Sequence, residues 1–295
     1  QVVGGQMTTT NIESTVWDHT LSLNFDKDIS DRINLNGTIG LNPRKERVEV
    51  SFLNSTQQNV YGLLTHQNFE EQTGSTGFND FNIVGAYASA TLGFDNYLFL
   101  NVQGRNDWFS SLPRANRSIF YPSASLSFIP TAAIESLKGS KTLNYLKLRL
   151  GYGSSAGFPA AYSTVVGLAS GTNVFDSPTG GTTNTLGISN TLGNPDLKPE
   201  LITEIEAGIE TRLFDNRLGF DLSVYRKVSE DLILQAKQLD PSTGYTLTAD
   251  NLGEVSNEGI EIGFNINPIR PKNPEGFRWD ISGQYTIWCA SAMVL

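Results

Sequence analysis

The chain has 295 residues, of which 30 are acidic and 21 basic, giving a formal net charge of −9. This balance argues against nucleic acid as the main partner, because phosphate binding requires a surplus of Lys and Arg. The single cysteine, Cys289, excludes an intrachain disulfide framework, and the two histidines belong to no metal-ligand motif. No apolar run approaches the roughly 18 residues of a transmembrane helix. The first ten residues also lack the basic and apolar regions of a signal peptide.

Apolar and polar residues alternate along the chain, and a period of two is typical of a strand with one apolar and one wet face. In residues 84–94, for example, Val84, Leu92 and Phe94 share a face, and Tyr87 and Thr91 lie on the other. In chain order the predicted strands cover residues 17–25, 33–42, 83–94, 97–106, 120–129, 145–153, 201–213, 218–228, 255–267 and 277–288. Helical spacing appears only near 132–137. The sequence therefore predicts an all-β fold.

Strand length and connection length indicate which all-β fold this is. Strands of soluble proteins usually have about 5–6 residues, whereas several here alternate for about ten, enough to cross a bilayer when tilted. Short connections, such as those around 95–96 and 215–216, alternate along the chain with long polar stretches at 43–82, 106–119, 154–199 and 235–254. This pattern favours a partial antiparallel transmembrane β-barrel of about ten strands, with short turns at one end and long loops at the other.

Several sequence blocks resemble one family. Residues 104–108 (GRNDW) with 120–123 (FYPS), 146–153 (LKLRLGYG), 193–200 (GNPDLKPE) and 251–261 (NLGEVSNEGIE) are similar, in the same order, to blocks of the SusC/RagA-type TonB-linked outer-membrane proteins. The resemblance covers roughly residues 80–288. It implies a bacterial outer-membrane barrel of 22 strands, plugged by an N-terminal domain. It also implies uptake of oligosaccharides or peptides, powered by the TonB complex, with a SusD-like surface lipoprotein as a lid.

The chain departs from that pattern in two ways. It contains no plug-like or TonB-box-like segment, and it has only about half of the strands of the family barrel. We therefore expect residues 1–288 to be part of a barrel wall in contact with outer-membrane lipid. Residues 289–295 lose the alternation, and we interpret them as an atypical tail with a non-native end. Transport is expected of the parent protein, and no enzyme activity or cofactor is predicted.

Arg105, Asn106, Asp107 and Trp108 are the candidate ligand-contact residues, because they enter a long loop from the top of a predicted strand. In one interpretation Trp108 stacks on a sugar or an apolar substrate. In the other the residues form a structural cluster, with Trp108 in the aromatic girdle and Arg105 paired with an acid. Both interpretations stay open at this point.

Glu204, Glu206 and Glu210 form a predicted lumen-facing acidic row. The row could bind a cation or tune substrate passage, or it could reflect a wet face that accepts any polar residue. It does not predict a glycosidase, because neighbours on one strand face do not oppose each other across a sugar. Substrate specificity is expected in the loop of residues 154–194. In that loop Gly180, Gly181, Thr182 and Thr183 lack the spacing and the Lys of a phosphate-binding loop.

A different class of protein remains as the alternative: a secreted or surface all-β binding module, such as an adhesin or a sandwich, without transport activity. The outward face discriminates between the two classes, because a membrane barrel keeps an uncharged band about 25 Å tall on successive strands. In the most regular predicted strands the charges fall on the other face. This favours the barrel.

Overall fold

The computed structural model describes residues 4–176, 182–269, 271 and 275–293. An antiparallel sheet of 11 strands dominates it, in the order β1-β3-β4-β5-β6-β7-β11-β12-β15-β16, with β2 also paired to β3. Its strands are β1 (Gln6–Asp18), β2 (Leu21–Ser30), β3 (Ile33–Gln58), β4 (Phe69–Phe94), β5 (Leu98–Phe109), β6 (Ser118–Phe128), β7 (Leu143–Gly157), β11 (Glu200–Leu213), β12 (Leu218–Glu230), β15 (Glu254–Ile269) and β16 (Trp279–Met293). Within the described ranges, no helix is long and apolar enough to cross a membrane.

The remaining elements belong to the connections. The long loops contain a hairpin of β8 (Leu168–Asp176) with β9 (Thr182–Ile188), and a small sheet of β10 (Thr191–Leu192), β14 (Leu247–Asn251) and β13 (Ile233–Gln238). Short helical turns are η1 (His66–Asn68), α1 (Pro130–Ala133), η2 (Glu135–Leu137) and η3 (Pro241–Thr243). The helical turn expected near 132–137 is thus present as α1 and η2.

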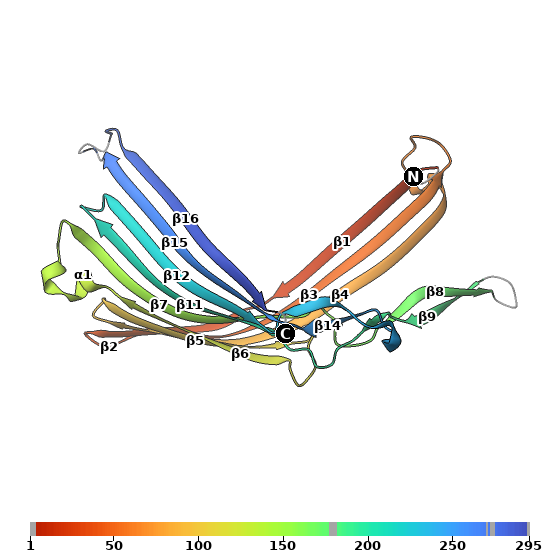
Figure 1. Cartoon of the computed structure of the whole chain (residues 1–295), viewed down its shortest axis with the longest axis horizontal. Helices are drawn as coiled ribbons and strands as arrows, with labels where there is room; N and C mark the ends of the chain where they lie inside the picture. The colour runs from red at the N-terminus through yellow and green to blue at the C-terminus, as the bar shows by residue number, and fades with distance from the viewer. Residues whose placement is uncertain (1–3, 177–181, 270, 272–274, 294–295) are drawn as a thin grey trace.

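The main sheet is strongly curved and does not close on itself (Figure 1). Its edges are β1 with β2 on one side and β16 on the other. Short connections, with α1, lie on the left of Figure 1, and the β8–β9 hairpin extends to the right. The all-β fold is therefore confirmed, and an open curved sheet is consistent with part of a barrel wall. The expected difference in connection length holds only in part, because residues 129–142 between β6 and β7, at the short-turn end, form a longer connection than residues 59–68 or 110–117 at the other end.

The first predicted strand, 17–25, is wrong in its bounds. β1 and β2 lie end to end along β3, and the break falls at His19 and Thr20. The residue opposite this break is Pro43, which has no N–H to donate to the ladder, although its carbonyl accepts a hydrogen bond from the His19 N–H at 3.1 Å. Counting β1 and β2 as one interrupted strand gives the ten predicted strands.

The polar stretch 43–82 is mostly strand, not loop. β3 and β4 pair without a break from Ile33–Phe94 to Thr56–Glu71, and only residues 59–68 connect them. Alternation continues beyond Pro43, but its phase inverts. Lys45 and Arg47 continue the face of Leu35 and Leu41, whereas Val48, Val50 and Phe52 continue the face of Asn34 and Asn36. The high average polarity of residues 43–58 therefore made this amphipathic part of β3 resemble a loop in the sequence.

β16 likewise continues through Cys289 to Met293, which pairs with Glu254 of β15. The predicted end of this strand at residue 288 is therefore wrong, because the strand continues to Met293. Backbone pairing with β15 sustains the strand where the alternation of side chains weakens.

One face of the sheet is apolar, and no second layer of described residues covers it. A row of directly paired side chains on this face runs from β3 to β16 and contains Leu35, Leu92, Leu100, Leu126, Leu150, Ala207, Val224, Ile260 and Ile287. Several of these side chains are substantially exposed, including Leu150 at 54%. Among the described residues, the buried apolar side chains are few: Phe69, Phe109, Leu112, Leu197 and Ala249. The stability of such a sheet requires an apolar environment for that face.

The long loops converge on Leu197, which is fully buried with Phe109, Leu112 and Ala249. The Asn116 amide donates to the Leu197 carbonyl at 3.0 Å. The Asn251 side chain accepts from the Lys198 N–H at 2.9 Å and donates to the Lys198 carbonyl at 3.0 Å. We call residues 193–199 and these contacts the loop cluster. It ties together three connections, β5–β6, β7–β11 and β12–β15, next to the first residue of β11.

Candidate functional site

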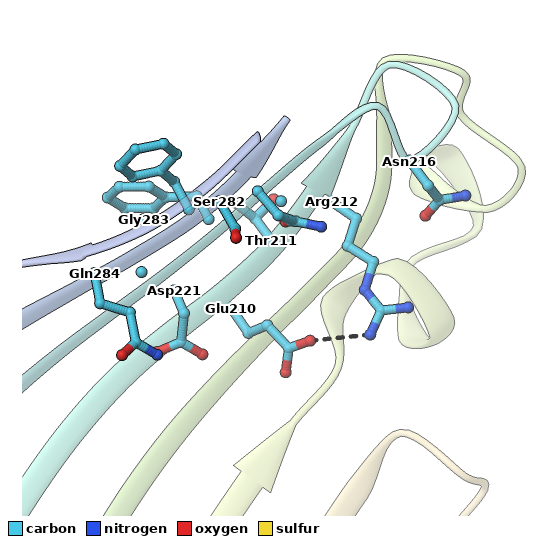
Figure 2. Close-up of a pocket in the computed structure, with 13 residues that line it drawn as sticks. Glu210, Thr211, Arg212, Asn216, Asp221, Ser282, Gly283 and Gln284 are labelled. Atoms are coloured by element: carbon cyan, nitrogen blue, oxygen red, sulfur yellow. Dashed lines mark hydrogen bonds and ion pairs between the residues drawn. The ribbon is translucent and has the colours of Figure 1, made fainter. Parts of the chain in front are cut away.

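Cavities of the sheet lie on its polar face. One of about 650 Å³ lies toward the short turns and is lined by residues of β11, β12, β15 and β16. In Figure 2, Glu210, Asp221 and Gln284 project from three of these strands on the same side of the sheet. Glu210 accepts a hydrogen bond from Arg212 at 3.2 Å. This face offers hydrogen-bonding and charged groups to whatever fills the interior.

The predicted acidic row is spread along this face, and Glu206 takes part in a network. The Arg149 guanidinium donates to both carboxylate oxygens of Asp221, at 2.8 and 2.6 Å, and to Glu206 at 3.3 Å. The Ser223 hydroxyl donates to Glu206 at 2.9 Å. Arg149 crosses over β11 at Gly208, where a Cβ would lie 2.4 Å from its Nε. The cation next to Glu206 is therefore the Arg149 guanidinium of the same chain.

The ion pairs of this face leave no dense group of metal ligands. In the part of the chain that the structure describes, no three His, Cys, Asp or Glu residues are placed to hold a metal ion. Glu204 lines a separate hollow of about 450 Å³ together with Glu206 and Lys227. Glu204 and Glu206 thus share one hollow, and Glu210 lines another along the same strand.

The four candidate ligand-contact residues do not form one constellation. They are consecutive in β5, so Arg105 and Asp107 lie on the polar face, and Asn106 and Trp108 lie on the apolar face. Asn106 donates to the Ser118 hydroxyl at 3.0 Å, and Trp108 is 42% exposed. Alternation therefore separates the candidate residues into two pairs with different surroundings.

Asp107 is the most buried charged residue of the polar face, with 4% exposure. Arg105 Nε donates to its two carboxylate oxygens at 2.9 and 3.0 Å, and the Tyr121 hydroxyl donates to it as well. Arg105 Nη2 reaches the Asn42 side-chain oxygen at 3.2 Å. Burial of a carboxylate is costly unless it is paired in this way, so Asp107 holds both Arg105 and Tyr121 in place.

Sequence reasoning missed Tyr121 and Asn42. The signal for Tyr121 was the FYPS block at 120–123, which follows GRNDW and pairs with it in the sheet. The sequence gives no such signal for Asn42, because its contact with Arg105 depends on the register of β3 relative to β4. Gly180 and Gly181, in the loop expected to carry specificity, lie outside the described residues, and Thr182 and Thr183 belong to β9.

An ion pair links two turns at the end of the sheet that carries the short connections. Arg32, between β2 and β3, donates through Nε to Asp95, in the β4–β5 turn, at 2.7 Å. This hydrogen bond and the charge of the guanidinium lower the pKa of the Asp95 carboxyl from its usual value. The pair links two adjacent turns outside the strands.

A curved antiparallel sheet with an unpartnered apolar face, a wet cavity-bearing face, and short and long connections at opposite ends defines the wall of a membrane β-barrel. The chain matches the family of TonB dependent receptor-like β-barrels over residues 3–291. It belongs to this family, whose members reside in the bacterial outer membrane. The family consists of receptors rather than enzymes.

Known relatives agree with this assignment. The chain is 22% identical over 94% of its length to TonB-dependent receptor P26 of Formosa agariphila, and 26% identical over 72% of its length to receptor P3 of the same organism. It covers 28% and 20% of these two receptors. The chain therefore spans less than a third of the length of these curated relatives.

Solved structures show the same fold. The RagAB peptide importer in its open-open state superposes with a TM-score of 0.82 at 18% identity, over 98% of this chain and 31% of that one. The siderophore receptor PiuA of Acinetobacter baumannii gives a TM-score of 0.58 at 14% identity, over 95% and 39% of the two chains.

Proposed function

We propose that this chain forms part of the barrel wall of an outer-membrane importer that takes up oligosaccharides or peptides. TonB-dependent energy drives the uptake, and a SusD-like surface lipoprotein covers the barrel mouth. The observation that carries the proposal is the family match over nearly the whole chain, together with the sheet's division into apolar and wet faces.

Two further observations support a large polar cargo. The superposition on the peptide importer is much better than that on the siderophore receptor, at TM-scores of 0.82 and 0.58. The polar face also carries hollows of about 450–650 Å³, each of the size that holds a small ligand or one unit of a larger one.

Uptake in the native bacterium tests the proposal. A strain that lacks the complete receptor should fail to grow on one oligosaccharide or peptide source, and a strain that lacks TonB should show the same defect. Deletion of the gene for the SusD-like lipoprotein should reduce uptake of the same compound. Normal uptake of every oligosaccharide and peptide tested in the receptor deletion would overturn the proposal.

A further inference from the structure

A cavity of about 460 Å³ lies on the polar face of β4, β5 and β6, next to the buried Asp107. Its lining includes Thr38, Tyr87, Ser89, Gln103, Arg105 and Tyr121. We propose that this cavity, the wall pocket, binds one sugar unit of a neutral oligosaccharide. The inference rests on the proposed function, and it chooses between the two substrate classes named there.

The position of Tyr87 supports this assignment. Its ring leans over Gly40 of the neighbouring strand, where a Cβ would lie 2.3 Å from the ring Cζ. Only glycine leaves space for the ring to lie against the wall. The Arg105 guanidinium lies 5.8 Å from the ring centroid. A ring that is held in this way provides a flat apolar surface with a polar edge, which suits the C–H face of a sugar ring.

Unused planar hydrogen-bonding groups lie beside that ring. Arg105 uses Nε and Nη2 for Asp107 and Asn42, whereas its Nη1 bonds to none of the described residues. Gln103 is exposed, and its side-chain amide forms no hydrogen bond with any residue that the structure describes. A guanidinium edge supplies donors and an amide supplies a donor and an acceptor. Two planar groups of this kind match the neighbouring hydroxyls of a sugar.

The charge of the wall pocket and its lack of a free backbone edge favour a sugar over a peptide. The ion pair of Arg105 with Asp107 leaves the wall pocket without net charge, so a carboxylate ligand would compete with Asp107 for the guanidinium. Extended peptides are commonly bound by strand addition at a free sheet edge. β4, β5 and β6 are interior strands with both neighbours present. The wall pocket therefore offers side chains but no backbone edge, which favours a neutral sugar over a peptide.

The test is direct binding to the purified complete receptor, measured by calorimetry with neutral oligosaccharides and with peptides of similar size. Gln103→Ala should raise Kd about three- to tenfold, because it removes one or two hydrogen bonds. It breaks no protein contact, so folding does not confound the result. Tyr87→Ala should raise Kd about tenfold or more. The matched control is Tyr225→Ala, because Tyr225 leans over Gly259 on the same face, where a Cβ would lie 2.6 Å from its Cζ.

The outcomes separate this inference from the proposed function. Oligosaccharide binding that is weakened by Gln103→Ala and Tyr87→Ala, but not by Tyr225→Ala, supports the wall pocket. Unchanged binding in both pocket variants overturns it, even if TonB-dependent uptake of that oligosaccharide is intact. Binding of peptides alone, or of no compound in the panel, also overturns it. Specific sugar binding without any uptake in cells would instead overturn the proposed function and leave the wall pocket standing.

Discussion

Placing a lysine on the apolar face should destabilise the folded barrel, and Val102 of β5 is the sharpest position for this test. Val102 is 49% exposed and pairs with Ala90 and Ala124, so apolar residues flank it on both sides. It lies four residues from the start of β5, about 13 Å along the strand. At a tilt of about 40° this places it about 10 Å deep, near the middle of a band about 25 Å tall.

Val102→Lys should therefore cost about 2–4 kcal/mol, a factor of about 30 to 900 in the folding equilibrium. The assay is urea titration of the complete receptor folded into lipid vesicles. The adjacent Gln103 lies on the wet face and is exposed, so Gln103→Lys should change the free energy of unfolding by less than about 0.5 kcal/mol. Equal losses in the two variants would refute the assignment of one face to lipid.

Three further predictions concern other parts of the sheet. Arg149→Met should lower stability by about 1 kcal/mol, because Asp221 and Glu206 lose their partner but are 44% and 38% exposed; an unchanged urea midpoint would contradict this. Gly193→Ala should speed cleavage of the loop cluster by proteinase K, since its Cβ would lie 2.3 Å from the Val165 backbone, whereas Gly167→Ala meets nothing within 4 Å and should leave the rate unchanged. Arg32 lowers the pKa of Asp95, so the pair should stabilise the fold above about pH 4 and lose this effect as pH falls through the lowered pKa. Asp95→Asn should remove that part of the acid dependence of unfolding, and an identical pH profile would argue against the ion pair.

The sequence predicts the wall well where one physical rule operates along the whole strand. From residue 83 to 267 the period of two locates every strand of the main sheet, because each has lipid on one side and water on the other. The rule fails beyond Pro43, where β3 continues with its apolar residues on the opposite face. A strand that leaves the lipid no longer needs an apolar outer face, so its polar average resembles a loop.

The candidate site was less predictable, because it depends on contacts between strands. Residues 105–108 are adjacent in sequence but alternate between two faces, whereas Arg105 and Tyr121 lie 16 residues apart and share Asp107. The role of Gly40 and Gly208 also depends on register, since each leaves space for a side chain of a neighbouring strand. Alternation gives the face of a residue but not its partner.

Lipid covers the apolar face of each strand and, along β3, ends near Pro43. The most direct measurement is a scan of single cysteines in the complete receptor, with Cys289 replaced by Ser, each labelled with a fluorophore and quenched by brominated lipid. In β5, lipid should quench positions 98, 100 and 102 but not 99, 101 and 103. In β3, quenching should occur at 35, 39 and 41 and disappear at 45 and 47. Equal quenching of both faces, or strong quenching beyond position 43, would contradict the account.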